Sequence, residues 1–330
     1  SMQMVTGIIG IMLDLSEDAA TAPDVKVVTK CDNHGAITTT KETTGLSAVQ
    51  FGGIVSRMTY GITNFSYNHN HGAITFNDGG GSRRAGGIVA THSYSAIDNC
   101  TNNAPITNNG AAGATFLGGI IGGDVLAAIT NCTNSAEGVI RNSGELTGTN
   151  NFYAGGITAS DLEITHDNYV DYGYTAEDCH ITNCHNHGEV IHDGSCNSIF
   201  LAGICARTTS ANISRCTNTA AVKHIGVSKN NAYIAGICGR SCNSVSDCSN
   251  SAAITVGGER TLASGTLYTT GIAGTTNEAI TDCENTGAIT VNGDAANTTK
   301  IAVNVKDKVL YNKYGAVPFK INGEEFVILR

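Results

Sequence analysis

Short apolar segments recur at regular intervals along most of the chain. One pattern, Cys-x-Asn-x-(Gly/Ala)-x-(Ile/Val), begins at Cys31, Cys100, Cys132, Cys184, Cys216, Cys248 and Cys283, with a degenerate copy at Asn68. Four of the seven intervals between successive copies are 32 residues long. A fixed interval of this kind is the signature of a repeat architecture. The sequence therefore predicts a chain built from units of about 32 residues.

Each repeat unit contains three apolar segments. In the Cys segment the fixed positions alternate with variable ones, which is the period of a strand with one buried face. A Gly-Ile element such as Gly87-Ile88 comes earlier in the unit, and an apolar residue stands three places before the Cys, as Ile97 does before Cys100. An offset of three breaks the alternation, so we expect a corner there, occupied by Asn, Asp or Ser. Each unit therefore predicts three short strands.

The repeat determines the predicted fold class. A single unit cannot bury its apolar face, whereas units stacked in register bury it against one another. The sequence thus predicts an all-β fold, a right-handed parallel β-helix (solenoid) of about eight coils with three short strands per coil. The right hand follows from the strong preference of parallel crossovers. A leucine-rich-repeat horseshoe is the nearest alternative, but its Leu-rich frame is missing.

The end of the chain departs from the repeat. Residues 1–300 are assigned to the parallel β-helix repeat domain, and residues 301–330 to a C-terminal β cap. Residues 319–327 have the pattern of a hairpin around Asn322-Gly323. We expect a cap because the last coil of a solenoid otherwise exposes an open sheet edge.

Composition narrows the range of partners. Gly accounts for 40 of the 330 residues, and only 14% of residues are charged, which suits strands and tight turns. The net charge is −9 and there is no basic cluster, so we expect no nucleic-acid partner. The longest apolar run, Val5 to Leu13, is too short to span a bilayer, so we expect no direct membrane insertion. Ser1 before Met2 and the uncapped first coil indicate a piece of a longer protein.

The repeat also predicts two inward columns of side chains. Cysteines in the same repeat position should act as small apolar side chains, which favours reduced thiols. Better disulfide candidates are Cys205 with Cys238, and Cys196 with Cys242. Asparagines two positions later should form a hydrogen-bonded amide column without any ligand. The columns contain Cys100, Cys132, Cys184, Cys216, Cys248 and Cys283, and Asn102, Asn134, Asn186, Asn218, Asn250 and Asn285.

Histidines are dense between residues 179 and 196 but match no common zinc module. His34, His71 and His187 occupy one repeat position and should point outward, the first two on adjacent coils. We therefore expect solvated histidines, including His192, and no metal site.

A family resemblance follows from residues 85–89, Ala-Gly-Gly-Ile-Val, and residues 97–102, Ile-Asp-Asn-Cys-Thr-Asn. These segments resemble the GLUG-motif repeat of bacterial surface proteins, and the resemblance covers roughly residues 1 to 295. It implies a secreted or cell-surface location and an adhesin-like stalk. Such repeats also precede the catalytic part of some immunoglobulin A1-specific metallopeptidases, but this chain has no His-Glu-x-x-His, so that chemistry is not implied.

One insertion is the candidate ligand-binding site. The interval from Cys132 to Cys184 has 20 residues more than the regular unit, and insertions in repeat proteins often form binding loops. Its tyrosines could stack on sugars, its carboxylates could hold Ca²⁺ between residues 161 and 171, or the segment could cover an irregular coil. The candidate residues are Asp161, Glu163, Asp167, Tyr169, Asp171, Tyr172 and Tyr174.

These features favour a non-catalytic repeat domain. No complete catalytic constellation is present, so we do not expect an enzyme, and no cofactor is expected apart from Ca²⁺ at the loop. The leading hypothesis is a secreted or cell-surface adhesin-like binding module or stalk that binds a glycan or a host surface protein. The alternatives are a polysaccharide-active lyase or hydrolase that uses the insertion and an adjacent groove, or a pure structural spacer.

Overall fold

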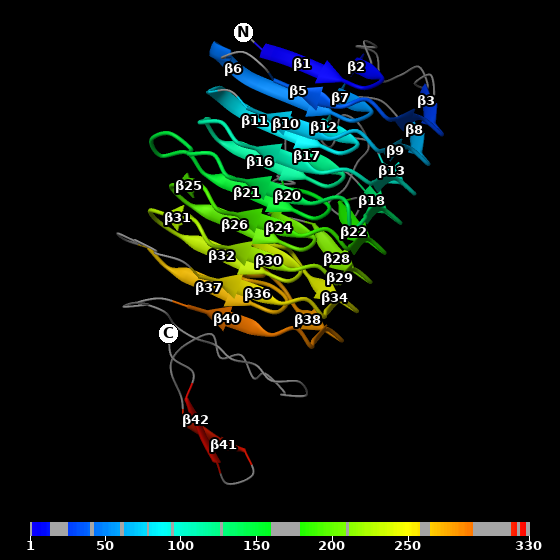
Figure 1. The fold of residues 1–330 in the computed structure, drawn as a ribbon. Helices are drawn as coiled ribbons and strands as arrows, with labels where there is room; N and C mark the ends of the chain where they lie inside the picture. Colours follow the sequence, from blue (N-terminus) through cyan, green and yellow to red (C-terminus); the bar gives the residue numbers. More distant parts are fainter. Residues whose placement is uncertain are drawn as a thin grey trace.

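The chain folds into a parallel β-solenoid in which each coil stacks on the next (Figure 1). Strands at equivalent positions of successive coils pair in parallel and in register, so Ile74, Ile106 and Ile140 lie side by side. The fold class predicted from the repeat is confirmed. The computed structural model describes residues 2–13, 26–39, 43–59, 63–77, 79–93, 96–125, 128–159, 179–208, 211–257, 265–292, 318–321 and 324–327.

A regular coil contributes five short strands rather than the predicted three, one to each of five sheets that we name A to E in chain order. Two of the expected strands are split by a bend. The Gly-Ile element bends at its glycine, where sheet A ends and sheet B begins. The Cys segment bends after its asparagine, because Asn102 Nδ2 donates to the carbonyl of Ala104 at 2.9 Å. Both bends lie within continuous apolar patterns, so periodicity alone did not reveal them.

Sheets A and B carry the Gly-Ile element. Sheet A contains β1 (Met2–Thr6), β6 (Thr43–Gly52), β11 (Gly80–Gly86), β16 (Thr115–Gly118), β21 (Phe152–Gly155), β26 (Ile199–Ala202), β32 (Ala232–Ala235) and β37 (Leu267–Thr270). Sheet B contains β2 (Ile9–Leu13), β7 (Val55–Thr59), β12 (Val89–Ser93) and β17 (Ile121–Val125), and later the pair β27 (Cys205–Arg207) and β33 (Cys238–Arg240).

Sheets C, D and E complete each coil. Sheet C contains β3 (Lys26–Thr29), β8 (Thr63–Ser66), β13 (Ile97–Asp98), β18 (Ala128–Thr130), β22 (His180–Thr182), β28 (Asn212–Ser214), β34 (Val245–Ser246) and β38 (Ile280–Thr281). Sheet D contains β4 (Asp32–Asn33), β9 (His69–Asn70), β14 (Thr101–Asn102), β19 (Thr133–Asn134), β23 (His185–Asn186), β29 (Thr217–Asn218), β35 (Ser249–Asn250) and β39 (Glu284–Asn285). Sheet E contains β5 (Ile37–Thr38), β10 (Ile74–Phe76), β15 (Ile106–Asn108), β20 (Ile140–Asn142), β24 (Val190–His192), β30 (Val222–His224), β36 (Ile254–Val256) and β40 (Ile289–Val291). An extra pair, β25 (Ser195–Cys196) and β31 (Val227–Ser228), precedes β26 and β32.

The stack is not equally regular along its length. Sheets A, C, D and E each have eight strands. In sheet B the coils of β21 and β37 show, within the described ranges, only the isolated bridges of Thr158 and Ala273. Six coils therefore have a strand in all five positions, so the complete part of the stack is shorter than the eight coils predicted.

The predicted corner between sheets C and D is present in every coil. The residue directly before the Cys position has a positive φ, for example 49° at Asn99 and 52° at Asp247. Asn and Asp tolerate this left-handed conformation better than other non-glycine residues, because their short polar side chains bond locally. The conformation recurs at Lys30, Tyr67, Asn99, Asn131, Asn183, Arg215, Asp247 and Asp282, so three of the eight corners hold Lys, Tyr or Arg instead of the expected Asn, Asp or Ser.

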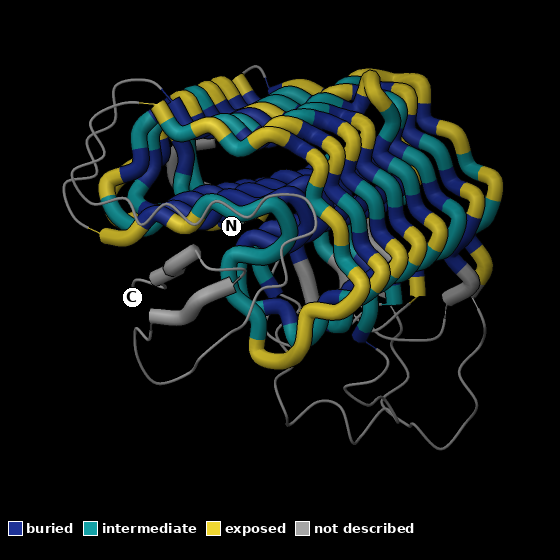
Figure 2. Tube along the Cα trace, turned by 90° about the horizontal axis from the view of Figure 1, so that it is seen from below, coloured by how far each residue is buried: buried dark blue, intermediate teal, exposed yellow. Residues whose placement is uncertain are grey.

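The interior holds two apolar clusters, and the walls of the coils that face them are buried (Figure 2). One cluster joins sheets B and C with the cysteine column, and the other joins sheets A and E. Where sheet A bends into sheet B, the chain meets the asparagines of sheet D. A Cβ at Gly87 would overlap the side chain of Asn102. This contact explains why the Gly-Ile element and the Cys-x-Asn element recur together.

The asparagines of sheet D form the predicted amide column. Each Nδ2 donates to the Oδ1 of the asparagine one coil further along the chain, at 2.7 to 2.9 Å. The column is continuous through Asn33, Asn70, Asn102, Asn134, Asn186, Asn218, Asn250 and Asn285. We call it the Asn ladder.

The C-terminal hairpin is also present. Strand β41 (Pro318–Ile321) pairs antiparallel with β42 (Glu324–Val327), with Phe319 opposite Phe326. The two residues between the strands are Asn322 and Gly323, as predicted. The proposed boundary at residue 300 lies outside the described residues, so the capping role remains a prediction.

The described part of the chain contains strands and turns but no helix. Within those residues, accordingly, no helix is long and apolar enough to cross a membrane.

Candidate functional site

The predicted ligand-binding loop lies outside the described residues, which stop at 159 and resume at 179. The structure therefore does not place Asp161, Glu163, Asp167, Tyr169, Asp171, Tyr172 or Tyr174, and the Ca²⁺ prediction for residues 161–171 also falls there. The two attachment points are described. Ala159 follows the sheet B bridge of Thr158, and Cys179 precedes β22 of sheet C.

The first attachment point packs against a row of aromatic side chains. Ala159 belongs to a buried cluster with Tyr153, Phe200 and Tyr233. These aromatic residues come from the outward positions of sheet A, while their strand neighbours, such as Leu201, point into the core. The candidate loop therefore begins beside an outer aromatic cluster that the sequence analysis did not identify.

The aromatic residues stack coil on coil. Ring centroids lie 4.6 Å apart between Phe116 and Tyr153, 4.6 Å between Tyr153 and Phe200, 5.2 Å between Phe200 and Tyr233, and 4.7 Å between Tyr233 and Tyr268. The planes differ by no more than 5°. In-register pairing of sheet A places each ring directly opposite the next.

The exposure of the rings changes along the row. Phe200 is 3% exposed, whereas Tyr268 in the last described strand of sheet A is 36% exposed. Stacked neighbours and small residues of sheet B, including Ala159 and Ala206, cover the central rings. The end at Tyr268 is thus the most accessible part of the row.

Arginines line the same row. The Arg84 guanidinium lies 5.1 Å from the centre of the Phe116 ring. Arg240 lies 5.0 Å from the centre of the Tyr233 ring and 5.8 Å from that of Phe200. Arg207 is the register partner of Arg240 in sheet B. We call the five aromatic residues together with Arg84, Arg207 and Arg240 the aromatic strip.

Polar groups complete the aromatic strip. Asn151 Nδ2 donates to the Tyr153 hydroxyl at 3.3 Å, and Asn197 Nδ2 donates to Asn151 Oδ1 at 3.0 Å. Burial raises the pKa of the Tyr233 hydroxyl, and the nearby charges of Arg240 and Arg207 act in the opposite direction. The strip therefore combines aromatic surface with amide, hydroxyl and guanidinium donors.

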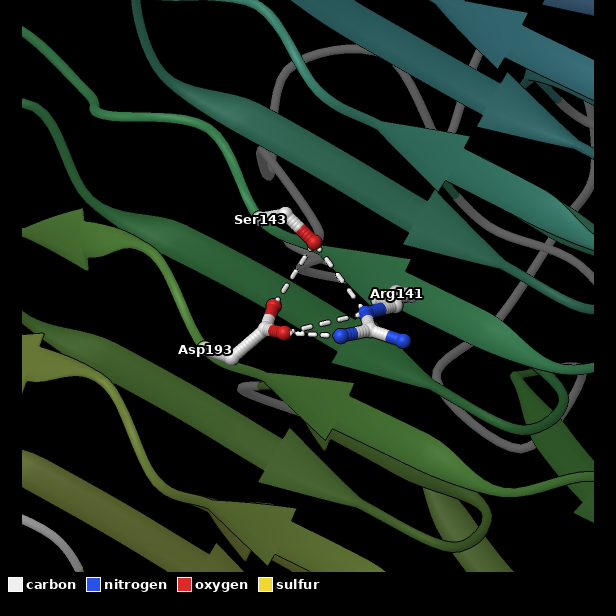
Figure 3. Close-up of polar contacts among 3 residues, drawn as sticks. All are labelled: Arg141, Ser143 and Asp193. Carbon is white, nitrogen blue, oxygen red and sulfur yellow. Dashed lines mark hydrogen bonds and ion pairs between the residues drawn. The ribbon is translucent and has the colours of Figure 1, made fainter.

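A second polar cluster lies on the outer face of sheet E (Figure 3). Arg141 forms an ion pair with Asp193, and Ser143 Oγ donates to Asp193 Oδ1 at 2.8 Å. Partial burial alone would raise the pKa of Asp193, but the hydrogen bonds from Arg141 and Ser143 outweigh it and lower the pKa. The carboxylate is already occupied by neighbouring side chains, so we do not treat this cluster as a ligand site.

The histidines fall into two groups. His34, His71 and His187 are exposed as predicted, and the rings of His34 and His71 stack at 4.7 Å on adjacent coils. The expectation of a solvated His192 is wrong, because His192 occupies an inward position of sheet E and is fully buried. Its desolvation lowers its pKa from 6.5 to about 4. Among the described residues, no group of three or more His, Cys, Asp and Glu could hold a metal ion.

The cysteines line the core. The predicted inward column is buried from Cys100 to Cys248, and no disulfide joins any of the twelve cysteines in the structure. Cys205 and Cys238 are register partners on adjacent coils, but the structure forms no disulfide between them, so this pairing stays a prediction. The candidate pair Cys196 and Cys242 is wrong, because the two residues belong to different apolar clusters. Cys196 lies opposite Ser228, and Cys242 bridges to Thr276.

A sequence signal for the aromatic strip does exist. Each ring stands three residues before the glycine of a Gly-Ile element, as Tyr153 does before Gly156. The signal is weak because Phe and Tyr interchange and the first three coils have Met4, Gln50 and Arg84 in that position. Comparisons with protein-family models, curated proteins and solved structures find no match to this chain.

Proposed function

We propose that this chain is a non-catalytic, secreted or cell-surface repeat domain of the GLUG type that acts as an adhesin-like binding module, with glycans as its ligands. The solenoid serves as a rigid stalk, and the aromatic strip with the adjoining loop binds the ligand. The proposed location rests on the resemblance of the repeat to bacterial surface proteins.

The aromatic strip is the observation that supports binding. Ligand sites combine apolar and aromatic surface with a few polar groups that fix orientation. Tyr268 offers partly exposed aromatic surface and stacks on Tyr233, whose ring is also contacted by the Arg240 guanidinium. The hydrogen bond from Asn151 to the Tyr153 hydroxyl holds that buried ring in place within the strip. The chain enters the candidate loop after Ala159, which packs in the same cluster as Tyr153, Phe200 and Tyr233.

Two alternatives make different predictions. A polysaccharide-active enzyme would use the loop carboxylates Asp161, Glu163 and Asp167, and would release products from a bound polymer. A pure spacer would need only the solenoid and its Asn ladder, and would bind no glycan. Measurements of binding and of product release with the purified chain therefore distinguish both alternatives from the binding module.

The test is glycan binding by the purified chain on a broad array of glycans and mucins. Three variants accompany it: Tyr268→Ala, replacement of residues 160–176 by a short Gly-Ser turn, and Tyr67→Ala. Tyr67 is a matched control because it is 49% exposed and lies at the corner between sheets C and D.

Binding that is lost in either of the first two variants and kept in Tyr67→Ala supports the proposal and locates the site. Depolymerisation of a bound glycan, abolished by Asp161→Ala or Glu163→Ala, favours the enzyme. Absence of binding by the unmodified chain contradicts the proposal and favours the spacer.

A further inference from the structure

The C-terminal end of the aromatic strip is its most positively charged part. Arg207 and Arg240 are register partners in β27 and β33, so their backbones are one coil apart, about 4.8 Å. Tyr233 and Tyr268 are register partners in β32 and β37 of the adjoining sheet. Two guanidinium groups and two tyrosines are therefore presented by consecutive coils.

Arg240 is held in place by its aromatic contacts. Its guanidinium lies 5.0 Å from the centre of the Tyr233 ring and 5.8 Å from that of Phe200. A guanidinium in contact with aromatic rings still carries N–H donors that can bind a planar anion in bidentate fashion. Both Arg207 and Arg240 are partly exposed. Little side-chain entropy would be lost when an anion binds Arg240, because its orientation is already restricted.

The local charge contrasts with that of the whole chain, which is −9. The positive charges that lower the pKa of the Tyr233 hydroxyl, against the effect of burial, are those of Arg240 and Arg207. Among the described carboxylates, Asp98 lies in sheet C and Asp193 follows sheet E, while Asp124 lies in sheet B two coils before Arg207. Positive charge on this end of the strip would attract an anionic group that the remainder of the molecule repels.

We propose that Arg207, Arg240 and Tyr268 form a subsite for an acidic sugar, in which the arginines bind a carboxylate or sulfate group and Tyr268 contacts the sugar ring. This inference rests on the proposed glycan-binding function and specifies its ligand class. Charge-assisted hydrogen bonds to arginine are roughly twice as strong as neutral ones, so the subsite would select acidic over neutral glycans.

The test is calorimetric titration of the full chain with four polymers. Polygalacturonate carries carboxylates and dextran sulfate carries sulfates, while methyl-esterified pectin and dextran are their neutral counterparts. We expect at least one acidic polymer to bind about tenfold more tightly than its neutral counterpart. The R207Q/R240Q double variant should lose this preference and keep the affinity for the neutral polymer.

Matched variants exclude trivial explanations. R141Q removes one positive charge from the outer face of sheet E, where Arg141 is 46% exposed, and should leave the preference unchanged. R240K keeps the positive charge but removes the planar guanidinium. R207Q removes one arginine and leaves Arg240 in place. Thermal melts of both variants show whether the coils remain folded. Equal affinity for acidic and neutral polymers overturns the subsite and leaves the glycan-binding function standing. A loss of the acidic preference in R141Q as large as that in R207Q/R240Q has the same meaning. Absence of binding to any polymer overturns the glycan-binding function itself.

Discussion

The Asn ladder and a second inward column, in sheet E, differ in how completely their polar groups form hydrogen bonds. In the Asn ladder, the Nδ2 of Asn186 donates both to Asn218 Oδ1 at 2.8 Å and to the Gly188 carbonyl at 3.0 Å. The parallel column of sheet E begins with Phe76, continues through Asn108 and Asn142, and then changes to His192 and His224. Asn108 donates to Asn142, but the ring nitrogens of His192 have no hydrogen-bond partner among the described residues.

The difference teaches what a repeated polar residue needs inside a protein. A buried amide is tolerated when each coil supplies both a donor and an acceptor to the next. A column that changes residue type part-way leaves polar atoms unpaired and carries a desolvation cost. The Asn ladder stabilises every coil, whereas the sheet E column makes part of the core sensitive to pH.

Interrupting the Asn ladder should have the largest effect. Asn186→Ala removes the acceptor of Asn134, the donor to Asn218 and the two bonds to the backbone of Gly188. We expect the free energy of unfolding to fall by about 4 kcal/mol, measured by urea denaturation at neutral pH. Asn103→Ala, one position outside the ladder, is the control and should change stability by less than about 0.5 kcal/mol. Equal losses in the two variants would show that the ladder adds no stability.

Acid should destabilise the second column. The pKa of His192 is lowered to about 4 by burial, whereas an unfolded histidine titrates near 6.5. Between these values the unfolded chain binds a proton that the folded chain does not, so this stabilising contribution is complete above about pH 6.5 and is lost as the pH falls towards 4. The loss should approach roughly 3 kcal/mol.

The histidine can be tested by urea denaturation between pH 4.5 and pH 7. The variant His192→Asn places an amide next to Asn142, which extends the short amide run and removes the titrating group. This variant should show a smaller loss of stability in acid than the unmodified chain. An unchanged pH profile would assign the acid sensitivity to other groups.

Removing the first amide of the second column should have a modest effect. Asn108 Nδ2 bonds Asn142 at 2.6 Å and the Gly110 carbonyl at 3.1 Å, but Asn108 Oδ1 has no hydrogen-bond partner among the described residues. Asn108→Leu should cost only about 1 kcal/mol, because it exchanges a partly paired amide for apolar surface beside Phe76. A loss as large as that of Asn186→Ala, measured by the same urea titration, would mean that the two columns are equivalent.

The smallest effect is expected on the outer face of the next strand of sheet E, β20. Arg141 precedes Asn142 in β20 and pairs with Asp193 at the surface (Figure 3). Exposed ion pairs contribute between zero and about 1 kcal/mol, so Arg141→Gln should lower the melting temperature by only a few degrees. A larger shift would indicate that the outer face of sheet E contributes as much as the inward columns.

The repeat predicted the features that recur in every coil. Identical spacing predicted the in-register strands, the inward asparagines and the corner before each Cys position, although not the left-handed backbone of that corner. It did not give the bends after Asn102 or at Gly87, because a bend between two buried residues leaves the apolar pattern unchanged. The burial of His192 was missed for a similar reason, since a histidine in an inward strand position looks the same in sequence as one in a loop.

The candidate site was harder to predict because the residue type at its repeat position varies between coils. Its aromatic rings begin only at Phe116, and the same position holds Arg84 and Gln50 in the preceding coils, so its members look unrelated along the chain. The loop residues chosen from the sequence remain predictions. Only their attachment at Ala159, beside Tyr153 and Phe200, connects them to the structure.

The direction of the Asn ladder has a consequence for assembly. Every amide donates towards the C-terminal coil and accepts from the N-terminal one, so the rod has two chemically different ends. Two rods that joined through this row would have to meet head to tail, since a twofold pairing would set donor against donor or acceptor against acceptor. Contacts of that kind do not close on themselves. Any association through the coil ends would therefore produce an open polar filament rather than a symmetric dimer.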